Sequence, residues 1–220
     1  LFFLLVIYNM RKKDISLNDP VIIIANGDFP THPIPIKYIE NSKTIICTDG
    51  AADKLISFGR SPNFVIGDFD STSIKINNRQ GEWIETPNQN KTDLEKTIEW
   101  CINNQIKNIN ILGCGGNRED HMIGNLFCLP RYYDHIKCKI ITNKSKIVCY
   151  SGENYIDVEI NQQISIIATE LIDDITIDGL KYNINNEILK PSSRAICNES
   201  ISKQFYLKSS GKVLVFFNHK

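Results

Sequence analysis

The sequence has no excess of charge of either sign. Its lysine and arginine residues number 25, and so do its aspartate and glutamate residues, which leaves a formal net charge of zero. No block of basic residues stands out along the 220 positions. Proteins whose main partner is nucleic acid or an anionic membrane usually carry such a block, so we expect no nucleic acid and no membrane as partner.

The sequence also lacks the cysteine spacings that are typical of disulfide frameworks and zinc sites. Its seven cysteines are odd in number, and none belongs to a CxxC motif. Several lie in apolar runs, where a reduced thiol packs as a small hydrophobic side chain. This usage predicts a cytoplasmic protein with reduced thiols.

Two nucleotide-binding motifs are missing as well. No GxGxxG follows the first predicted strand, residues 21–25, which makes a dinucleotide-dependent oxidoreductase the weakest option. The glycine-rich segment 113–116 has no GK[ST] and is therefore not a Walker A loop. Apolar residues 1–8 are too few to span a bilayer and lack a basic leader. We expect residues 1–20 to be an extension outside the fold, with translation starting at Met10.

The strongest signal in the sequence is a pair of aspartates after the apolar run 64–66. Gly67 is followed by Asp68 and Asp70, and two ionised carboxylates this close together require a cation to offset their repulsion. Oxygen ligands of this kind suit Mg²⁺, which completes its shell with water and substrate phosphate. A single such pair is more often a turn whose side chains cap backbone donors, so the surrounding motifs decide.

Three further acidic turns repeat this pattern. Asp49 follows the predicted strand 44–47, Asp93 begins a predicted helix, and Asp120 lies beyond the predicted strand 110–112. The carboxyl ends of parallel strands share one edge of a sheet, and ligands bind at that edge. The carboxylates that we expect to converge there are those of Asp49, Asp68, Asp70, Asp93 and Asp120.

Other residues at the same edge suit nucleotide phosphates. Asn26 and Gly27 follow the first strand, and they either contact a phosphate or only make the turn. Glycines at 113, 115 and 116 free successive backbone N–H groups to form an anion-binding nest, and Arg118 offers a planar fork for phosphate. His121 is either a general base or a neutral group that orients its neighbour. Lys91 and Lys96 either meet phosphate or lie on a solvated helix face.

Three helices are predicted in this half of the chain. The first opens with small residues at Gly50, where an anion is favoured, although Asp49 can equally serve as its N-cap. Thr92 and Glu95 form a capping box for the second, and Pro130 is expected to end the third. The buried face of the first helix is expected to consist of Leu55, Ile56 and Phe58, and the third helix is expected to carry Met122, Ile123, Leu126, Phe127 and Leu129.

The pattern changes after residue 143. Short alternating runs at 155–160, 163–168, 174–178, 203–207 and 213–217 are separated by polar turns, and no helical pattern interrupts them. We therefore predict an α/β N-terminal domain, residues 21–143, with a parallel Rossmann-like sheet. An all-β domain, residues 144–220, is predicted to follow it as a sandwich or small barrel.

The order of the motifs DGAAD, GDFDS, QNKTD, GGNREDH and GLKY, followed by the turn at Asn198-Glu199, resembles the thiamine pyrophosphokinase family from about Val21 onward. The resemblance implies a nucleotide-binding catalytic domain joined to a β-sandwich thiamine-binding domain, and a homodimer. It also implies transfer of pyrophosphate from ATP to the hydroxyethyl group of thiamine with Mg²⁺, which gives thiamine diphosphate and AMP.

The resemblance assigns roles to individual residues. Asp49, Asp68, Asp70 and Asp93 are implied to hold the metal, with Asp70 as a direct ligand and either Asp49 or Asp93 receiving the hydroxyl proton. The implied ATP-binding residues are Asn26, Gly27, Asp49, Gly50, Lys91, Thr92, Gly115, Gly116, Arg118, Asp120 and His121. The implied thiamine-binding residues are Gln89, Cys197 and Asn198. The chain departs from the family at Asn90, where many members have Asp, and at Cys197, where Ser is common.

Two other functions fit the same motifs. One is a pyrophosphokinase for a different small alcohol, such as a hydroxymethylpterin, since the acceptor would be selected in the β half. The other is a nucleotide-binding module without activity. Five aspartates together with Arg118 argue against the second option, because binding alone does not need so many.

Overall fold

The computed structural model describes residues 19–116 and 118–220. The predictions of an extension over residues 1–20 and of a start at Met10 therefore lie almost entirely outside the described residues. The first described strand begins at Val21, as the apolar run predicts.

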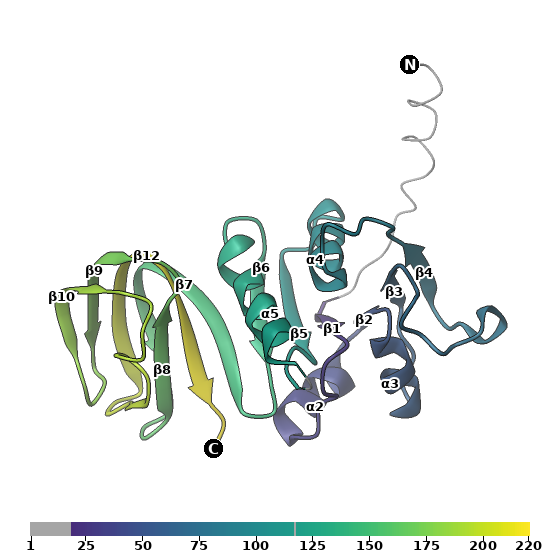
Figure 1. The fold of residues 1–220 in the computed structure, drawn as a ribbon. Coiled ribbons are helices and arrows are strands. Elements are labelled where there is room, and N and C mark those ends of the chain that lie inside the picture. Colours follow the sequence, from purple (N-terminus) through teal and green to yellow (C-terminus); the bar gives the residue numbers. More distant parts are fainter. Residues whose placement is uncertain (1–18, 117) are drawn as a thin grey trace, which may run out of the picture.

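The N-terminal half is a parallel sheet with the strand order β4-β3-β2-β1-β5-β6 (Figure 1). Its strands are β1 (Val21–Ile24), β2 (Thr44–Thr48), β3 (Phe64–Gly67), β4 (Glu82–Glu85), β5 (Asn108–Leu112) and β6 (Lys137–Ile141). The order reverses at β1, because β2 to β4 extend to one side and β5 and β6 to the other. Such a switch point opens a crevice at the carboxyl ends of the neighbouring strands, here β1 and β5.

Helices cover both faces of this sheet. They are α2 (Pro33–Asn41), α3 (Ala51–Ser57), α4 (Asp93–Asn103) and α5 (Glu119–Arg131), and a short 3-10 helix, η1, covers Ile76–Asn78. Ile22 and Ile24 of β1 pack in one core with α2 and α3, whereas Ile23 packs in the other core with α4 and α5. The continuous β-branched run is thus explained, because alternate side chains enter two different cores.

The C-terminal half continues the same sheet through β7 (Ser145–Asp157), which pairs antiparallel with β6. The remaining strands are β8 (Gln163–Ala168), β9 (Ile172–Asp178), β10 (Ile184–Leu189), β11 (Asn198–Glu199) and β12 (Gln204–Asn218). All of their pairings are antiparallel, and a separate core of their apolar side chains lies between them. Among the described residues no helix follows α5, as the alternating pattern predicted.

The long strand β12 organises this half. One of its edges pairs with β7 along most of its length, and the other pairs with β9 through Tyr206–Ser209 and with β8 through Val213–Phe217. The two runs predicted at 203–207 and 213–217 are therefore one strand, interrupted by a register shift between Ser209 and Val213. A bulge of this kind bends a strand and lets its two ends join different neighbours.

The sheet as a whole is mixed, because the parallel and antiparallel parts form one hydrogen-bonded set of strands from β4 to β10. The predicted parallel sheet and the predicted succession of β-strands are both present, and the pairing of β6 with β7 joins them. None of the helices in the described ranges has the length and apolar character needed to cross a bilayer.

Several local predictions are wrong. Gly50, not Asp49, is the N-cap of α3, and no side chain caps that helix. Phe58 is 40% exposed, because it follows the helix and packs on Phe29 at the surface. Helix α5 continues past Pro130 to Arg131, since a proline so close to the helix end removes only one late backbone bond. The helix carries Ile123 and Phe127, as expected, and both side chains are exposed.

Candidate active site

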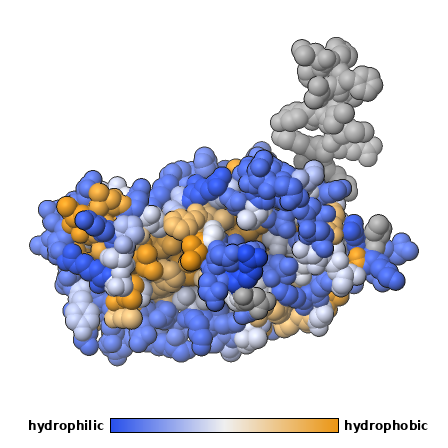
Figure 2. All heavy atoms as spheres, in the orientation of Figure 1, coloured by the Kyte–Doolittle hydropathy of each residue, from blue (hydrophilic) through white to orange (hydrophobic). Residues whose placement is uncertain are grey.

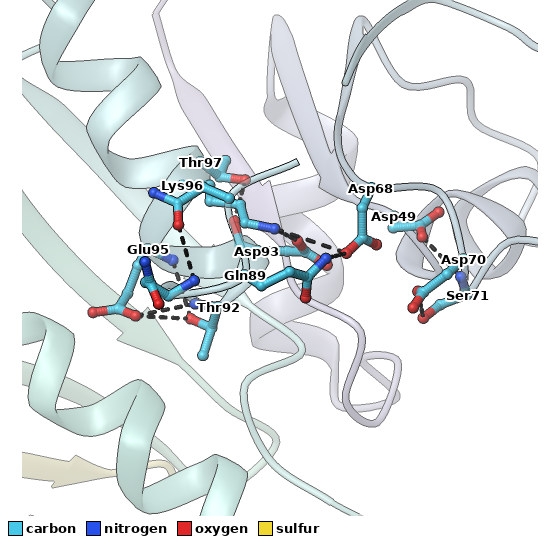
Figure 3. Close-up of polar contacts among 12 residues, drawn as sticks. Asp49, Asp68, Asp70, Ser71, Gln89, Thr92, Asp93, Glu95, Lys96 and Thr97 are labelled. Atoms are coloured by element: carbon cyan, nitrogen blue, oxygen red, sulfur yellow. Dashed lines mark hydrogen bonds and ion pairs between the residues drawn. The ribbon is translucent and has the colours of Figure 1, made fainter. Parts of the chain in front are cut away.

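Three carboxylates meet at the carboxyl ends of β2 and β3. Asp49, Asp68 and Asp70 each place one oxygen within 4.8 Å of the others. Figure 3 shows the three side chains side by side. Asp49 is buried beneath the other two, and Asp70 is exposed at the entrance. The predicted convergence of acidic turns is therefore present for these three residues.

The two oxygens of Asp49 have different surroundings. Oδ2 accepts a hydrogen bond of 2.9 Å from the backbone N–H of Ser71, whereas Oδ1 is buried and has no hydrogen-bond partner among the described residues. Burial raises the pKa of Asp49, and the carboxylates of Asp93, Asp70 and Asp68 raise this pKa further. An unpaired, buried carboxylate oxygen beside two more carboxylates fits the oxygen ligands that Mg²⁺ takes.

The backbone of the GDFDS motif is shaped to allow this meeting. A Cβ atom at Gly67 would lie 2.8 Å from the Cβ of Asp49, so only glycine leaves room for the buried carboxylate. Phe69 adopts a φ of 66°, an unusual conformation for a bulky residue. Arg79 holds the Phe69 ring from one side, 4.8 Å from its centroid, and Trp83 packs edge-on against it. The turn is thus strained and supported by its own following loop.

Helix α4 supplies a fourth carboxylate and a buried cation. Lys96 is only 7% exposed; its Nζ lies 2.9 Å from Oδ1 of Asp93 and 4.0 Å from Oδ2 of Asp68. Gln89 donates a hydrogen bond of 2.8 Å to the same oxygen of Asp68. That bond, with the nearby charge of Lys96, holds the pKa of Asp68 below its ordinary value. The cluster therefore combines four carboxylates with one internal lysine.

The start of α4 is fixed by the predicted capping box. Thr92 Oγ1 accepts from the N–H of Glu95, and the Glu95 carboxylate accepts from the N–H of Thr92. The Nζ of Lys91, which is expected to bind ATP, lies 2.7 Å from a carboxylate oxygen of Glu99. The carboxylate of Glu99 also accepts from the Tyr132 hydroxyl at 3.0 Å. In this arrangement Lys96, not Lys91, is the lysine that lies beside the carboxylates.

The loops after β1 and β5 are joined at the switch point. The N–H of Gly27 donates to the carbonyl of Gly113 at 2.8 Å, and the N–H of Asp28 donates to the carbonyl of Gly115 at 2.7 Å. A Cβ at Gly27 would lie 2.2 Å from the Gly115 oxygen, so the close approach requires glycine. Lys54 of α3 donates to the carbonyl of Gly27 at 2.7 Å and also to that of its neighbour. Sequence reasoning missed this lysine.

The remaining expected nucleotide residues lie in the loops and at the helix starts that follow β1, β2 and β5. A Cβ at Gly50 would collide with the Asn26 amide, so these two residues are in contact. Arg118 and Asp120 form an exposed ion pair of 2.5 Å, and the hydrogen bond from Arg118 lowers the pKa of Asp120 to about 2. The backbone N–H of His121 donates to the same carboxylate at 2.9 Å. Asp120 is thus placed with Arg118 and not in the three-carboxylate cluster.

The expected thiamine residues divide between two parts of the chain. Gln89 lies at the acidic cluster, whereas Cys197 and Asn198 lie at β11, which pairs with β8. The buried Asn198 amide accepts from the N–H of Tyr182 at 3.0 Å and donates to the Tyr182 carbonyl at 2.7 Å. Cys197 is exposed and has a φ of 57°. In the sheet, β12, β7, β6, β5 and β1 stand between β8 and β2.

Fold and site together define an α/β protein with a cluster of carboxylates at the carboxyl edge of its parallel strands, the edge at which such proteins bind ligands. Residues 36–142 match the family model described as "Thiamin pyrophosphokinase, catalytic domain". The chain is 30% identical over 189 residues to the thiamine pyrophosphokinase of Bacillus subtilis, covering 81% of this chain and 88% of that protein. The chain therefore belongs to the thiamine pyrophosphokinase family, as the motif order indicated.

Other comparisons agree. Thiamin pyrophosphokinase 1 of Caenorhabditis elegans is 29% identical over 191 residues, with 79% of this chain and 78% of that protein covered. A crystal structure of the Bacillus subtilis enzyme superposes with a TM-score of 0.76 at 27% identity, and covers 91% of this chain and 99% of its own. These findings do not favour a pterin pyrophosphokinase or an inactive nucleotide-binding module.

Proposed function

We propose that this protein is a thiamine diphosphokinase, which transfers pyrophosphate from ATP to thiamine and gives thiamine diphosphate and AMP. The observation that carries the proposal is the unpaired, buried Oδ1 of Asp49 beside Asp68 and Asp70, in a chain that belongs to this family. A nucleotide triphosphate is strongly anionic, so carboxylates can hold it only through a bound cation.

The reaction forms one bond and breaks one. The hydroxyethyl oxygen of thiamine bonds to the β-phosphorus of ATP, and the bond between that phosphorus and the oxygen bridging to the α-phosphorus breaks. AMP leaves with the bridging oxygen, and the hydroxyl proton passes to a carboxylate. Positioning and charge neutralisation account for most of the catalysis in such transfers, since no covalent intermediate with the protein is needed.

The carboxylates have separate tasks in this proposal. Asp49, Asp68 and Asp70 hold Mg²⁺, with Asp93 nearby, and the bound ion neutralises charge on the phosphates. Either Asp49 or Asp93 accepts the hydroxyl proton. In the structure Asp93 is paired with Lys96, whereas Oδ1 of Asp49 has no partner among the described residues. Lys96 keeps the cluster from carrying four uncompensated charges.

The nucleotide lies over the joined β1 and β5 loops. Asn26 and Gly27 of the β1 loop, with Gly50 beside them, contribute to its site together with the glycines at 115 and 116 of the β5 loop, which is hydrogen-bonded to the β1 loop. Arg118 turns from Asp120 to the phosphates when ATP is bound, since both side chains are 64% exposed and their pair is easily exchanged. Lys91, Thr92, Asp120 and His121 are the remaining proposed nucleotide contacts, and Lys91 would have to leave Glu99 to make its contact.

We also propose that the two halves of the chain bind different substrates. The protein is further proposed to be a homodimer and to reside in the cytoplasm. Residues 21–143 form the Rossmann-like nucleotide-binding domain, and residues 144–220 form a sandwich that binds thiamine. A hydrophobic core made only of C-terminal residues supports this division, although Ile147, Cys149 and Leu214 pack in the core of the N-terminal half. Cys197 and Asn198 lie far along the sheet from Asp49. A thiamine pocket that contains these two residues and also adjoins Asp49 therefore needs a second copy of the chain. Apolar side chains over the C-terminal strands and beside α5 offer it a contact surface (Figure 2).

The test is product analysis with the purified protein, ATP, Mg²⁺ and thiamine. We expect thiamine diphosphate and AMP in equal amounts, and no product when Mg²⁺ is chelated. Release of ADP, or turnover of hydroxymethylpterin in place of thiamine, would show a different transferase. Light scattering on the same preparation measures the mass, which is expected to be that of two chains.

A further inference from the structure

Asp53, the last residue of the DGAAD motif, has no part in the functions described above, yet its carboxylate is heavily used. Its Oδ1 accepts from the Thr72 hydroxyl at 2.7 Å, and its Oδ2 accepts from the backbone N–H of Ser73 at 2.8 Å. The Ser73 hydroxyl also donates to Oδ2. Three donors on two consecutive residues of one loop thus converge on one side chain of α3.

The loop that Asp53 holds is the one that carries the metal-binding carboxylates. Ser71, the residue before Thr72, donates its N–H to Asp49 and its hydroxyl to Oδ1 of Asp70 at 2.8 Å. Asp49 and Asp53 are four residues apart and so project from neighbouring turns of the chain at the start of α3. Together they fasten the backbone N–H groups of residues 71 and 73.

This fastening acts on a strained turn. Phe69, between Asp68 and Asp70, has a φ of 66°, which a bulky residue rarely adopts without support from its surroundings. If the bonds to residues 71–73 are lost, the turn is free to relax to an ordinary conformation. The oxygens of Asp68 and Asp70 would then no longer lie within 4.8 Å of that of Asp49.

We infer that Asp53 is a positioning residue, which holds the Asp68–Ser73 turn in the shape that binds the divalent cation. The inference rests on the proposed function and deepens it. Asp53 is not itself a ligand, because each of its oxygens is occupied by hydrogen bonds to the loop, whereas Oδ1 of Asp49 has no partner. Residues that orient metal ligands in this way typically change metal affinity ten- to a hundredfold when they are replaced.

Mn²⁺ binding, followed by EPR on the full chain, tests the inference without reference to catalysis. Asp53→Asn loses one acceptor and is expected to bind Mn²⁺ about tenfold more weakly than the wild type. Asp173→Asn, the same substitution at an exposed acid of β9, is the matched control and is expected to bind as the wild type does. In activity assays, Asp53→Asn is expected to need about tenfold more Mg²⁺ for half-maximal rate and to recover at saturating Mg²⁺.

A second pair of variants keeps the test valid should Asp53→Asn fail to fold. Thr72→Val removes one donor to Asp53 and is expected to weaken Mn²⁺ binding, whereas Thr72→Ser retains the hydroxyl and is expected to restore it. Wild-type Mn²⁺ affinity in Asp53→Asn, or in Thr72→Val where the first variant does not fold, overturns the inference. A wild type that binds Mn²⁺ but makes no thiamine diphosphate would refute the proposed function and leave this comparison intact.

Discussion

At the scale of single residues, Asp49 carries a charge in a place that water scarcely reaches. It is 1% exposed, and three other carboxylates raise its pKa in addition to burial. Burial of an ionised carboxylate without a partner for one of its oxygens lowers the stability of the folded chain. Asp49 therefore lowers the stability of the folded chain, and its benefit is the binding of a cation.

The sign of this effect can be tested with Asp49→Asn. Because the folded-state pKa of Asp49 is raised, its favourable contribution to stability is present below the unfolded pKa and is lost as the pH rises through the folded pKa. We expect the variant to melt above the wild type at pH 7 in a chelator, with the difference shrinking toward pH 4, and to be inactive. Thermal melts at both values measure this; a variant that melts lower at pH 7 would contradict it.

Asp70 is expected to matter for turnover and little for stability. It lies exposed at the entrance of the site, so Asp70→Asn should leave the melting temperature almost unchanged. If Asp70 acts directly on the charge of the transition state, the variant should lose activity by roughly a hundredfold or more. Steady-state rates at saturating Mg²⁺, with Asp173→Asn as control, provide the measurement. Near-wild-type activity would refute the assignment.

The sequence is informative about these carboxylates for a simple reason. Asp49 and Asp68 each follow an apolar run, and the carboxyl ends of parallel strands have to meet, so their convergence follows from topology. Side chains whose role depends on long-range contact are not visible in this way. Lys96 looks like a solvated lysine in a helical pattern, and only the packing of α4 against β3 buries it. Asp53 likewise gains its role from a loop 20 residues away.

At the scale of elements, the joint between the β1 and β5 loops depends on the absence of a side chain at Gly27. A Cβ there would lie 2.2 Å and 2.4 Å from two backbone oxygens of the β5 loop, which cannot move aside as a flexible side chain can. We expect Gly27→Ala to lower both the melting temperature and the affinity for ATP. Calorimetry with ATP and Mg²⁺ gives the affinity.

Gly124→Ala is the matched control for that variant. Gly124 lies within α5, and a Cβ added to it meets nothing within 4 Å. Alanine is favoured over glycine inside a helix by about 1 kcal/mol, so this variant should be slightly more stable than the wild type and bind ATP normally. Equal effects of the two substitutions would show that the joint between the loops does not matter.

Element positions were more predictable than element ends. The apolar runs gave β1, β2 and β3, and the capping box at Thr92 placed the start of α4. The predicted end of α5 at Pro130 is wrong by one residue, because a proline in the final turn of a helix does not have to end it. The bulge in β12 was not visible either, since Ser209 to Lys212 reads as a polar turn unless both neighbouring strands are known.

At the scale of the whole molecule, the cysteines are distributed very unevenly. Six are buried and only Cys197 is exposed. Burial raises the pKa of Cys128, Cys138 and Cys149 to about 12, and it raises that of the other three buried thiols as well. A thiol with a raised pKa is a poor nucleophile.

We expect one thiol per native chain to react rapidly with Ellman's reagent, and seven after unfolding in guanidinium. Cys197→Ser should abolish the rapid phase and leave the slow one. Several rapidly reacting thiols in the native protein would show that the cores open readily. The distribution of reduced thiols is also what supports the proposed cytoplasmic location.

Continuity of the sheet across the two halves is the property of the whole molecule that sequence reasoning could not supply. The change of pattern after residue 143 indicates different architectures on its two sides, and this is what the strands show. The parallel strands and the antiparallel strands form one sheet because β6 pairs with β7. Only three residues separate β6 from β7, a connection short enough for a hairpin, but the sequence pattern was interpreted as a domain boundary at this point.

The place of β12 in the sheet has a consequence for how the chain is made on the ribosome. Every strand of the N-terminal half has been synthesised by Ile141, whereas β7, β8 and β9 each pair with β12, which comes after them all. Nascent chains that stop short of Gln204 should hence contain a folded, protease-resistant N-terminal half followed by strands that lack their β12 partner. During that interval the emerging polypeptide exposes open strand edges, which is when chaperones would be needed most.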